Sequence, residues 1–91
     1  MSWKIIYHPD ITLDLKRLPQ NIKKRIQNAI EERLCVDPFK YGSRLRRSLH
    51  GFWKLRVGDY RVIYQLNREG ICILIIGHRK EVYEKIHARG N

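Results

Sequence analysis

The sequence predicts an α+β fold in which an antiparallel sheet of about four strands carries a two-helix hairpin on one face and ends in a short C-terminal helix or tail. Three patterns indicate this class: two amphipathic helical stretches near the N-terminus, a β-hairpin pattern in the middle, and a later strand that is apolar at every position. A chain of 91 residues is expected to form a single domain, residues 1–91, around one modest core.

The N-terminal third is predicted to be a strand followed by the two helices. Residues 3–8 (WKIIYH) have the isoleucine and aromatic content of a strand. Asp10 is a suitable cap for a helix over 11–18, which Pro19 ends because proline disfavours helix at the residue before it. A longer helix is predicted over 20–34. The apolar positions of the two helices are Ile11, Leu15 and Leu18, and then Ile22, Ile26, Ala29, Ile30 and Leu34.

The middle of the chain, FWKLRVGDYRVIYQ, is predicted to be a β-hairpin with Gly58 and Asp59 as its two-residue turn. Pairing then runs outward from Val57 and Tyr60, and it places Arg56 directly opposite Arg61. One face of the hairpin is apolar and consists of Trp53, Leu55, Val57, Tyr60, Val62 and Tyr64. The other face is basic and consists of Lys54, Arg56 and Arg61.

The remaining segments complete the sheet. A loop is predicted from Asp37-Pro38, with a turn near Gly42, and residues 44–49 are a strand or an extended segment. Residues 71–76 (ICILII) are predicted to be a central strand that is covered on both faces. Residues 78–87 are expected to be a short polar segment, helical or irregular, with apolar side chains that pack back on the sheet.

The charge is strongly positive, because 19 Lys and Arg outnumber 9 Asp and Glu for a net charge of +10. Residues 40–91 carry most of the excess, with twelve basic and four acidic side chains. Such a field attracts nucleic acid, an anionic membrane or an acidic protein. No apolar run is long enough to span a bilayer and no signal peptide is evident, so we expect a cytoplasmic protein that does not act at a membrane.

The basic hairpin face is the candidate site. Two arginines opposite each other destabilise a sheet unless an anion lies between them, and the planar guanidinium suits phosphate. His78 and Arg79 follow the apolar strand directly, and Tyr83 comes four residues later. We expect these side chains to converge on one concavity. The predicted catalytic set is Lys54, Arg56, Arg61, His78, Arg79 and Tyr83, and the predicted RNA contacts are Arg44, Arg46, Arg47 and Lys80.

This set is suited to RNA cleavage without a metal or cofactor. The chain has no carboxylate pair or His/Cys cluster to hold a metal, whereas RNA supplies its own nucleophile, the 2′-OH. Two arginines would stabilise the charge of the phosphorane, Lys54 and His78 are candidates for proton transfer, and Tyr83 would stack on a base or orient a phosphate. Simple polyanion binding and a solvated basic surface remain alternatives.

The runs LHGFWKLRVGDYRVIYQL and IIGHRKEVY closely resemble the RelE/ParE toxin superfamily of bacterial and archaeal toxin–antitoxin modules, and the RelE branch in particular. The resemblance covers nearly the whole chain. It implies a microbial-ribonuclease-like fold and a metal-independent endoribonuclease, an mRNA interferase that cuts mRNA in the A site of the 70S ribosome. It also implies a RelB-like antitoxin partner, through which the complex would bind operator DNA.

The resemblance also assigns residues. The family's basic pair corresponds to Lys54 and Arg56, its later arginines to Arg61 and Arg79, and its terminal tyrosine to Tyr83. The best-known member has a lysine where this chain has Phe52, and another where this chain has His78. The general base and acid therefore stay open among Lys54, His78 and Arg79.

Two further functions are compatible with the same family. A ParE-like toxin would poison DNA gyrase without nuclease chemistry, although that branch usually lacks the basic and tyrosine set found here. An inactive relative would survive only as an antitoxin-bound repressor component.

Overall fold

The protein is built on a five-stranded mixed sheet. The computed structural model describes residues 3–45 and 51–89. The strands run in the order β1-β5-β4-β3-β2, and β1 is parallel to β5 whereas the other neighbours are antiparallel. Their bounds are β1 (Ile5–Tyr7), β2 (Ser43–Arg44), β3 (Phe52–Val57), β4 (Tyr60–Asn67) and β5 (Gly70–His78). The predicted α+β class is confirmed, but the sheet has five strands rather than about four and is not antiparallel throughout.

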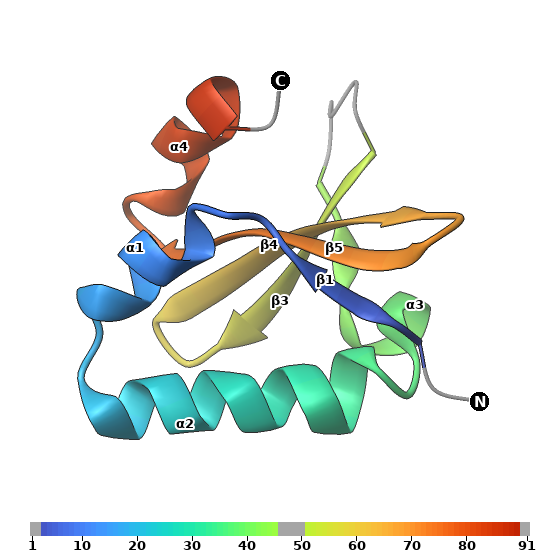
Figure 1. The fold of residues 1–91 in the computed structure, drawn as a ribbon, viewed down its shortest axis with the longest axis horizontal. Coiled ribbons are helices and arrows are strands. Elements are labelled where there is room, and N and C mark those ends of the chain that lie inside the picture. The colour runs from blue at the N-terminus through green and yellow to red at the C-terminus, as the bar shows by residue number, and fades with distance from the viewer. Residues whose placement is uncertain (1–2, 46–50, 90–91) are drawn as a thin grey trace.

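Two helices cover one face of this sheet, as the sequence predicts. α1 (Ile11–Lys16) and α2 (Gln20–Ala29) form the N-terminal helical hairpin, and α2 continues as a π-helical turn, η1 (Ile30–Leu34). α2 lies along one side of the sheet in Figure 1, and α4 (Val82–Arg89) lies on the other side. The main core between the helical hairpin and the sheet contains Ile11, Ile26, Ala29, Ile30, Leu34, Leu55, Val57, Val62, Tyr64, Ile71, Ile73 and Ile76.

The predicted loop at Asp37 contains a short helix, α3 (Pro38–Tyr41). The Asp37 carboxylate accepts hydrogen bonds from the backbone N–H groups of Phe39 (3.1 Å) and Lys40 (3.0 Å). Pro38 takes the first helical position, where its missing N–H costs nothing. The Asp37-Pro38 pair, which was predicted to begin a loop, therefore begins a short helix. Of the strand predicted over 44–49, Arg44 belongs to β2, and residues 46–50, which include Arg46 and Arg47, lie outside the described part of the chain.

The predicted hairpin is confirmed in its register. Val57 pairs with Tyr60 and Arg56 pairs with Arg61 across β3 and β4. Gly58 has φ 61° in the turn, a conformation that glycine adopts without a Cβ penalty.

The opposite face of the sheet carries a second apolar cluster under α4, as predicted for a central strand that is covered on both faces, although the hairpin part of this face was predicted to be basic. The buried members of this cluster are Phe52, Ile63, Leu74, Ile75 and Val82. Ile86 packs against the cluster from the next turn of α4. The basic side chains therefore occupy only the part of this face near the hairpin turn. Within the described residues, no helix is long and apolar enough to cross a membrane.

Tyr64 gives the fold a predicted sensitivity to alkaline pH. Its ring is fully buried, and its hydroxyl donates a hydrogen bond to the Pro38 carbonyl at 2.8 Å. Burial raises the pKa of Tyr64 well above the ordinary value. Because the folded protein then holds this proton more tightly than the unfolded chain, stability is complete below about pH 10 and declines as the pH rises further.

We therefore expect the free energy of unfolding to fall above about pH 10. Tyr64→Phe should cost about 1 kcal/mol at neutral pH, through the lost hydrogen bond, and should reduce the alkaline decline. Denaturant unfolding between pH 7 and 11 would measure both effects. An undiminished decline in Tyr64→Phe would contradict the assignment to this group.

Candidate functional site

Three cations lie on one face of the hairpin. Lys54 and Arg56 come from β3 at alternate positions, and Arg61 pairs with Arg56 from β4. Cross-strand partners share a face, so all three belong to the same surface, which we call the basic face. The Arg56 side chain is exposed, and Lys54 and Arg61 are half-buried.

Arg61 is held by the turn beside it. Its Nη1 donates to the carbonyl oxygens of Gly58 and Tyr60, both at 2.8 Å. Both acceptors are neutral, so the guanidinium is fixed without a carboxylate partner among the described residues. These two hydrogen bonds hold one end of the Arg61 guanidinium at the hairpin turn.

The segment after β5 brings Arg79 to the same end of the hairpin. The backbone N–H of Arg79 donates to the Asp59 carbonyl at 2.8 Å, and the Arg79 and Lys80 side chains are exposed. Gly77 lies opposite Arg61 in the sheet, and Val82 packs over it so closely that a Cβ at Gly77 would lie 3.2 Å from Cγ1 of Val82.

Tyr83 lies in the first turn of α4 with its side chain 40% exposed. Val82, its neighbour in sequence, is buried over the strand position opposite Arg61. The first turn of α4 thus borders the basic face, and the Tyr83 side chain in that turn is exposed.

His78 does not join the basic face, so the predicted convergence is wrong for this residue. It pairs with Tyr60, and the two rings make an edge contact at 5.7 Å between centroids. Tyr60 packs against the main core, on the face opposite Arg61. The Nδ1 of His78 accepts a hydrogen bond from the backbone N–H of Lys80 at 3.2 Å. His78 therefore lines a small polar hollow of about 170 Å³ beside α1 and α4.

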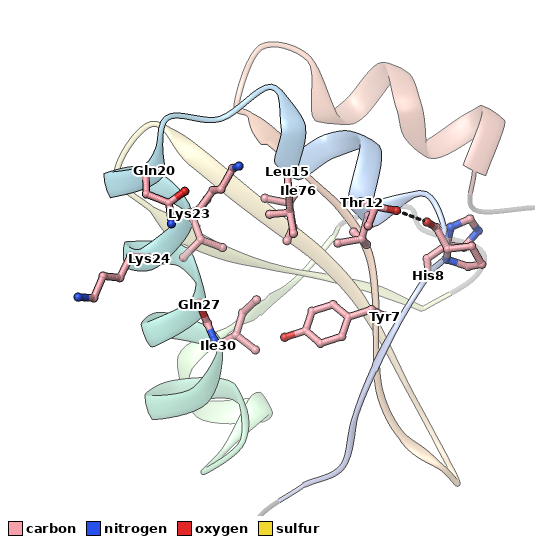
Figure 2. Close-up of a pocket in the computed structure, with 13 residues that line it drawn as sticks. Tyr7, His8, Thr12, Leu15, Gln20, Lys23, Lys24, Gln27, Ile30 and Ile76 are labelled. Atoms are coloured by element: carbon pink, nitrogen blue, oxygen red, sulfur yellow. Dashed lines mark hydrogen bonds between the residues drawn. The ribbon is translucent and has the colours of Figure 1, made fainter.

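A larger hollow of about 740 Å³ lies between α1, α2 and β1, away from the basic face. Figure 2 shows Tyr7 pointing across it toward Gln27 of α2 and Ile30 of η1, with Leu15 and Ile76 in its wall. Lys23 and Lys24 contribute to its lining from α2. The hollow thus combines an apolar wall with two lysines.

Neither surface holds a recognisable metal site. Within residues 3–45 and 51–89, no three His, Cys, Asp or Glu side chains are grouped so as to bind a metal ion. The functional groups of the basic face are the three cationic donors Lys54, Arg56 and Arg61.

Comparison with known proteins places the chain in a family. The model of the family described as "ParE toxin of type II toxin-antitoxin system, parDE" matches residues 5–83. The chain belongs to the RelE/ParE toxin superfamily. It is 30% identical to Toxin RelE3 of Methanocaldococcus jannaschii over 89% of this chain and 96% of that protein. It is 37% identical to Toxin RelE of Mycobacterium tuberculosis over 85% and 86% of the two chains.

Solved structures agree with this assignment. The RelBE2 toxin–antitoxin complex of Mycobacterium tuberculosis contains a chain with a TM-score of 0.78 and 28% identity, covering 87% of this chain and 100% of that one.

Two residues of this RelE/ParE toxin for which the sequence predicts no role lie close to the hairpin turn or to α4. Asp14 is buried beneath α4. It falls on the same face of α1 as Ile11 and Leu18, and a carboxylate among these apolar positions is a signal of burial that the sequence contains. Arg25 reaches from α2 to the hairpin turn, where a Cβ at Gly58 would lie 3.0 Å from its Nη1. No local sequence pattern indicated that contact.

Proposed function

We propose that this toxin is a ribosome-dependent endoribonuclease that cleaves mRNA in the A site without a metal ion. The observation that carries the proposal is the basic face, where Arg56 and Arg61 lie opposite each other and neither has a carboxylate partner among the described residues. A phosphodiester between them would remove the like-charge repulsion and receive guanidinium donors. The similarity to relatives named RelE toxins supports the same reading.

The proposed chemistry is transfer of the phosphate within the RNA. The 2′-oxygen forms a bond to phosphorus while the bond from phosphorus to the 5′-oxygen breaks, which leaves a cyclic phosphate and a 5′-hydroxyl. Arg56 and Arg61 stabilise the negative charge of the phosphorane. Lys54 shares their face and is our candidate for the base that accepts the 2′-hydroxyl proton, and Arg79 remains a candidate for the acid.

Other exposed groups would bind the RNA. Tyr83 is accessible at the start of α4 and offers a ring for base stacking. Arg44 and Lys80 are exposed cations that we assign to phosphate contacts, as we do Arg46 and Arg47 in the part of the chain that is not described.

The test is to induce the chain without its partner and map mRNA 5′ ends within minutes. We expect new 5′-hydroxyl ends inside translated regions, in a fixed register with codons, and their loss when translation is blocked. Uncut mRNA in arrested cells would reject the proposal.

The match to the ParE family model favours one alternative, a toxin that inhibits DNA gyrase. The same induction distinguishes the two functions. Gyrase poisoning gives DNA breaks and an SOS response with intact mRNA, whereas an inactive repressor component gives neither effect.

We also propose a RelB-like antitoxin as the partner, with operator DNA bound through that antitoxin. Structural neighbours are described as RelB–RelE complexes. The hollow between α1, α2 and β1 offers an apolar wall with two lysines, which suits an acidic amphipathic segment of such a partner.

The double variant Lys23→Glu/Lys24→Glu is expected to weaken antitoxin binding about 10- to 100-fold, because it places like charges against the acidic segment. Titration calorimetry with the purified cognate antitoxin would measure the change. The matched control is Lys40→Glu/Arg68→Glu, which alters the net charge equally at exposed positions outside the lining of the hollow. Equal losses in both variants would contradict this placement of the antitoxin.

A further inference from the structure

The C-terminal helix α4 has limited apolar attachment to the rest of the molecule. Val82 is buried in the second apolar cluster and Ile86 packs against it, whereas Tyr83 and Glu84 are exposed. Two apolar side chains in eight residues do not define how the far half of the helix is oriented. Polar contacts must supply that orientation.

Asp14 of α1 supplies the buried contacts of this kind, and the half-exposed Asp10 lies 3.6 Å from Nε of Arg89. The Asp14 side chain is 2% exposed, and its Oδ2 accepts a hydrogen bond from Nη1 of Arg89 at 2.6 Å, while Nζ of Lys85 lies 3.4 Å from Oδ1. Lys85 and Arg89 are four residues apart on α4 and so share one face of the helix. The two ion pairs thus join that face of α4 to α1, and the two helices lie side by side in Figure 1.

The same carboxylate binds the sheet. The parallel pairing with β1 ends where His8 donates to the carbonyl of Ile73, and the edge of β5 continues beyond it. Asp14 accepts from the backbone N–H of Ile76 at 3.0 Å, and Arg89 donates to the Leu74 carbonyl at 3.2 Å. Side chains of α1 and α4 therefore take the place of a longer β1, and they connect three elements at one point.

We propose that Asp14 is a positioning residue for the basic face. By holding Lys85 and Arg89, it sets the orientation of α4, whose first turn presents Tyr83 and whose preceding segment presents Arg79. The role in cleavage rests on the proposed nuclease function, whereas the effect on α4 does not. A displaced α4 would leave phosphate binding by Arg56 and Arg61 intact but misplace the groups beside the reacting phosphate.

The test is Asp14→Asn, which keeps an oxygen acceptor for Ile76 and removes the charge that holds the two cations. Hydrogen exchange should be at least tenfold faster in residues 82–89 and unchanged in β3 and β4. For ribosome-bound mRNA, kcat should fall about 10- to 100-fold while KM stays within twofold. The control is Asp10→Asn, the same chemical change at a half-exposed carboxylate 3.6 Å from Nε of Arg89, which should alter both readouts less than twofold.

Arg89→Gln provides a second variant, because Asp14 then keeps Lys85 and Ile76, and it should give the same faster exchange and lower kcat. If helix α4 exchanges at the wild-type rate in both variants, Asp14 does not orient it and the inference fails. If α4 exchanges faster but kcat is unchanged, Asp14 holds the helix without serving the site, and the inference fails in that part. A wild-type protein that cleaves no mRNA would reject the proposed function, and the exchange rates would still decide what Asp14 holds.

Discussion

Replacing Arg56 by alanine is expected to lower the rate constant for mRNA cleavage about 100- to 1000-fold with little loss of stability. The side chain is exposed, and it makes no hydrogen bond or ion pair among the described residues, so its removal disturbs few contacts. It would, however, remove one of two charges that face the phosphorane. Single-turnover cleavage of ribosome-bound mRNA would measure the loss, with the melting temperature as the check on folding.

Variants at related positions sharpen this test. Arg61→Ala should lose cleavage to a similar extent and also lose about 1–2 kcal/mol of stability, because two hydrogen bonds to turn carbonyls disappear. Arg68→Ala is the matched control, since Arg68 is exposed in the turn at the opposite end of β4. Cleavage at the wild-type rate by Arg56→Ala would count decisively against the nuclease proposal.

Gly70→Ala is expected to destabilise the fold strongly, by about 2–5 kcal/mol. Gly70 opens β5 with φ 141°, where residues with a side chain are strained. A Cβ there would overlap the backbone carbonyl of Lys4, which accepts the N–H of Ile71 at 2.8 Å. Backbone cannot move aside as a flexible side chain can, so β1 and β5 would have to separate. Denaturant unfolding would give the change in free energy.

Gly51→Ala separates the two causes of that loss. Gly51 also has a positive φ, 68°, but no atom of the described residues other than its chain neighbours lies within 4 Å of the position of an added Cβ. This variant should cost only the backbone term of about 1 kcal/mol. Equal losses at both glycines would show that the contact with Lys4 contributes nothing.

The hairpin could be predicted from sequence in detail because its determinants are local. Alternating side chains and a two-residue turn leave one register, so the opposition of Arg56 and Arg61 followed directly. The parallel placement of β1 had no such determinant. A three-residue apolar strand carries no mark of its partner, and only the complete sheet decides that it lies beside β5.

The positions of the site residues could be predicted only where the register of the strands could be predicted. His78 was expected to converge with Arg61 because it directly follows the apolar strand. Its actual partner is Tyr60, the residue before Arg61, and a shift of one residue reverses the face. The buried Asp14 is a charged residue among the apolar positions of α1, so its burial could be suspected from the sequence. Its partners Lys85 and Arg89, however, follow 71 and 75 residues later. Such long-range pairs leave no pattern in a single sequence.

The pairing of Ile5 with Ile71 has a consequence for biosynthesis. β1 is translated before the other strands of this sheet, but it can pair only after β5 has been translated, because β5 lies between β1 and β4 in the folded sheet. Contacts so distant along the chain form late and slowly. A nascent chain that stops before Gly70 lacks β5, the strand on which both β1 and α4 pack. The folded toxin domain is therefore expected to form only when translation of the domain is nearly complete.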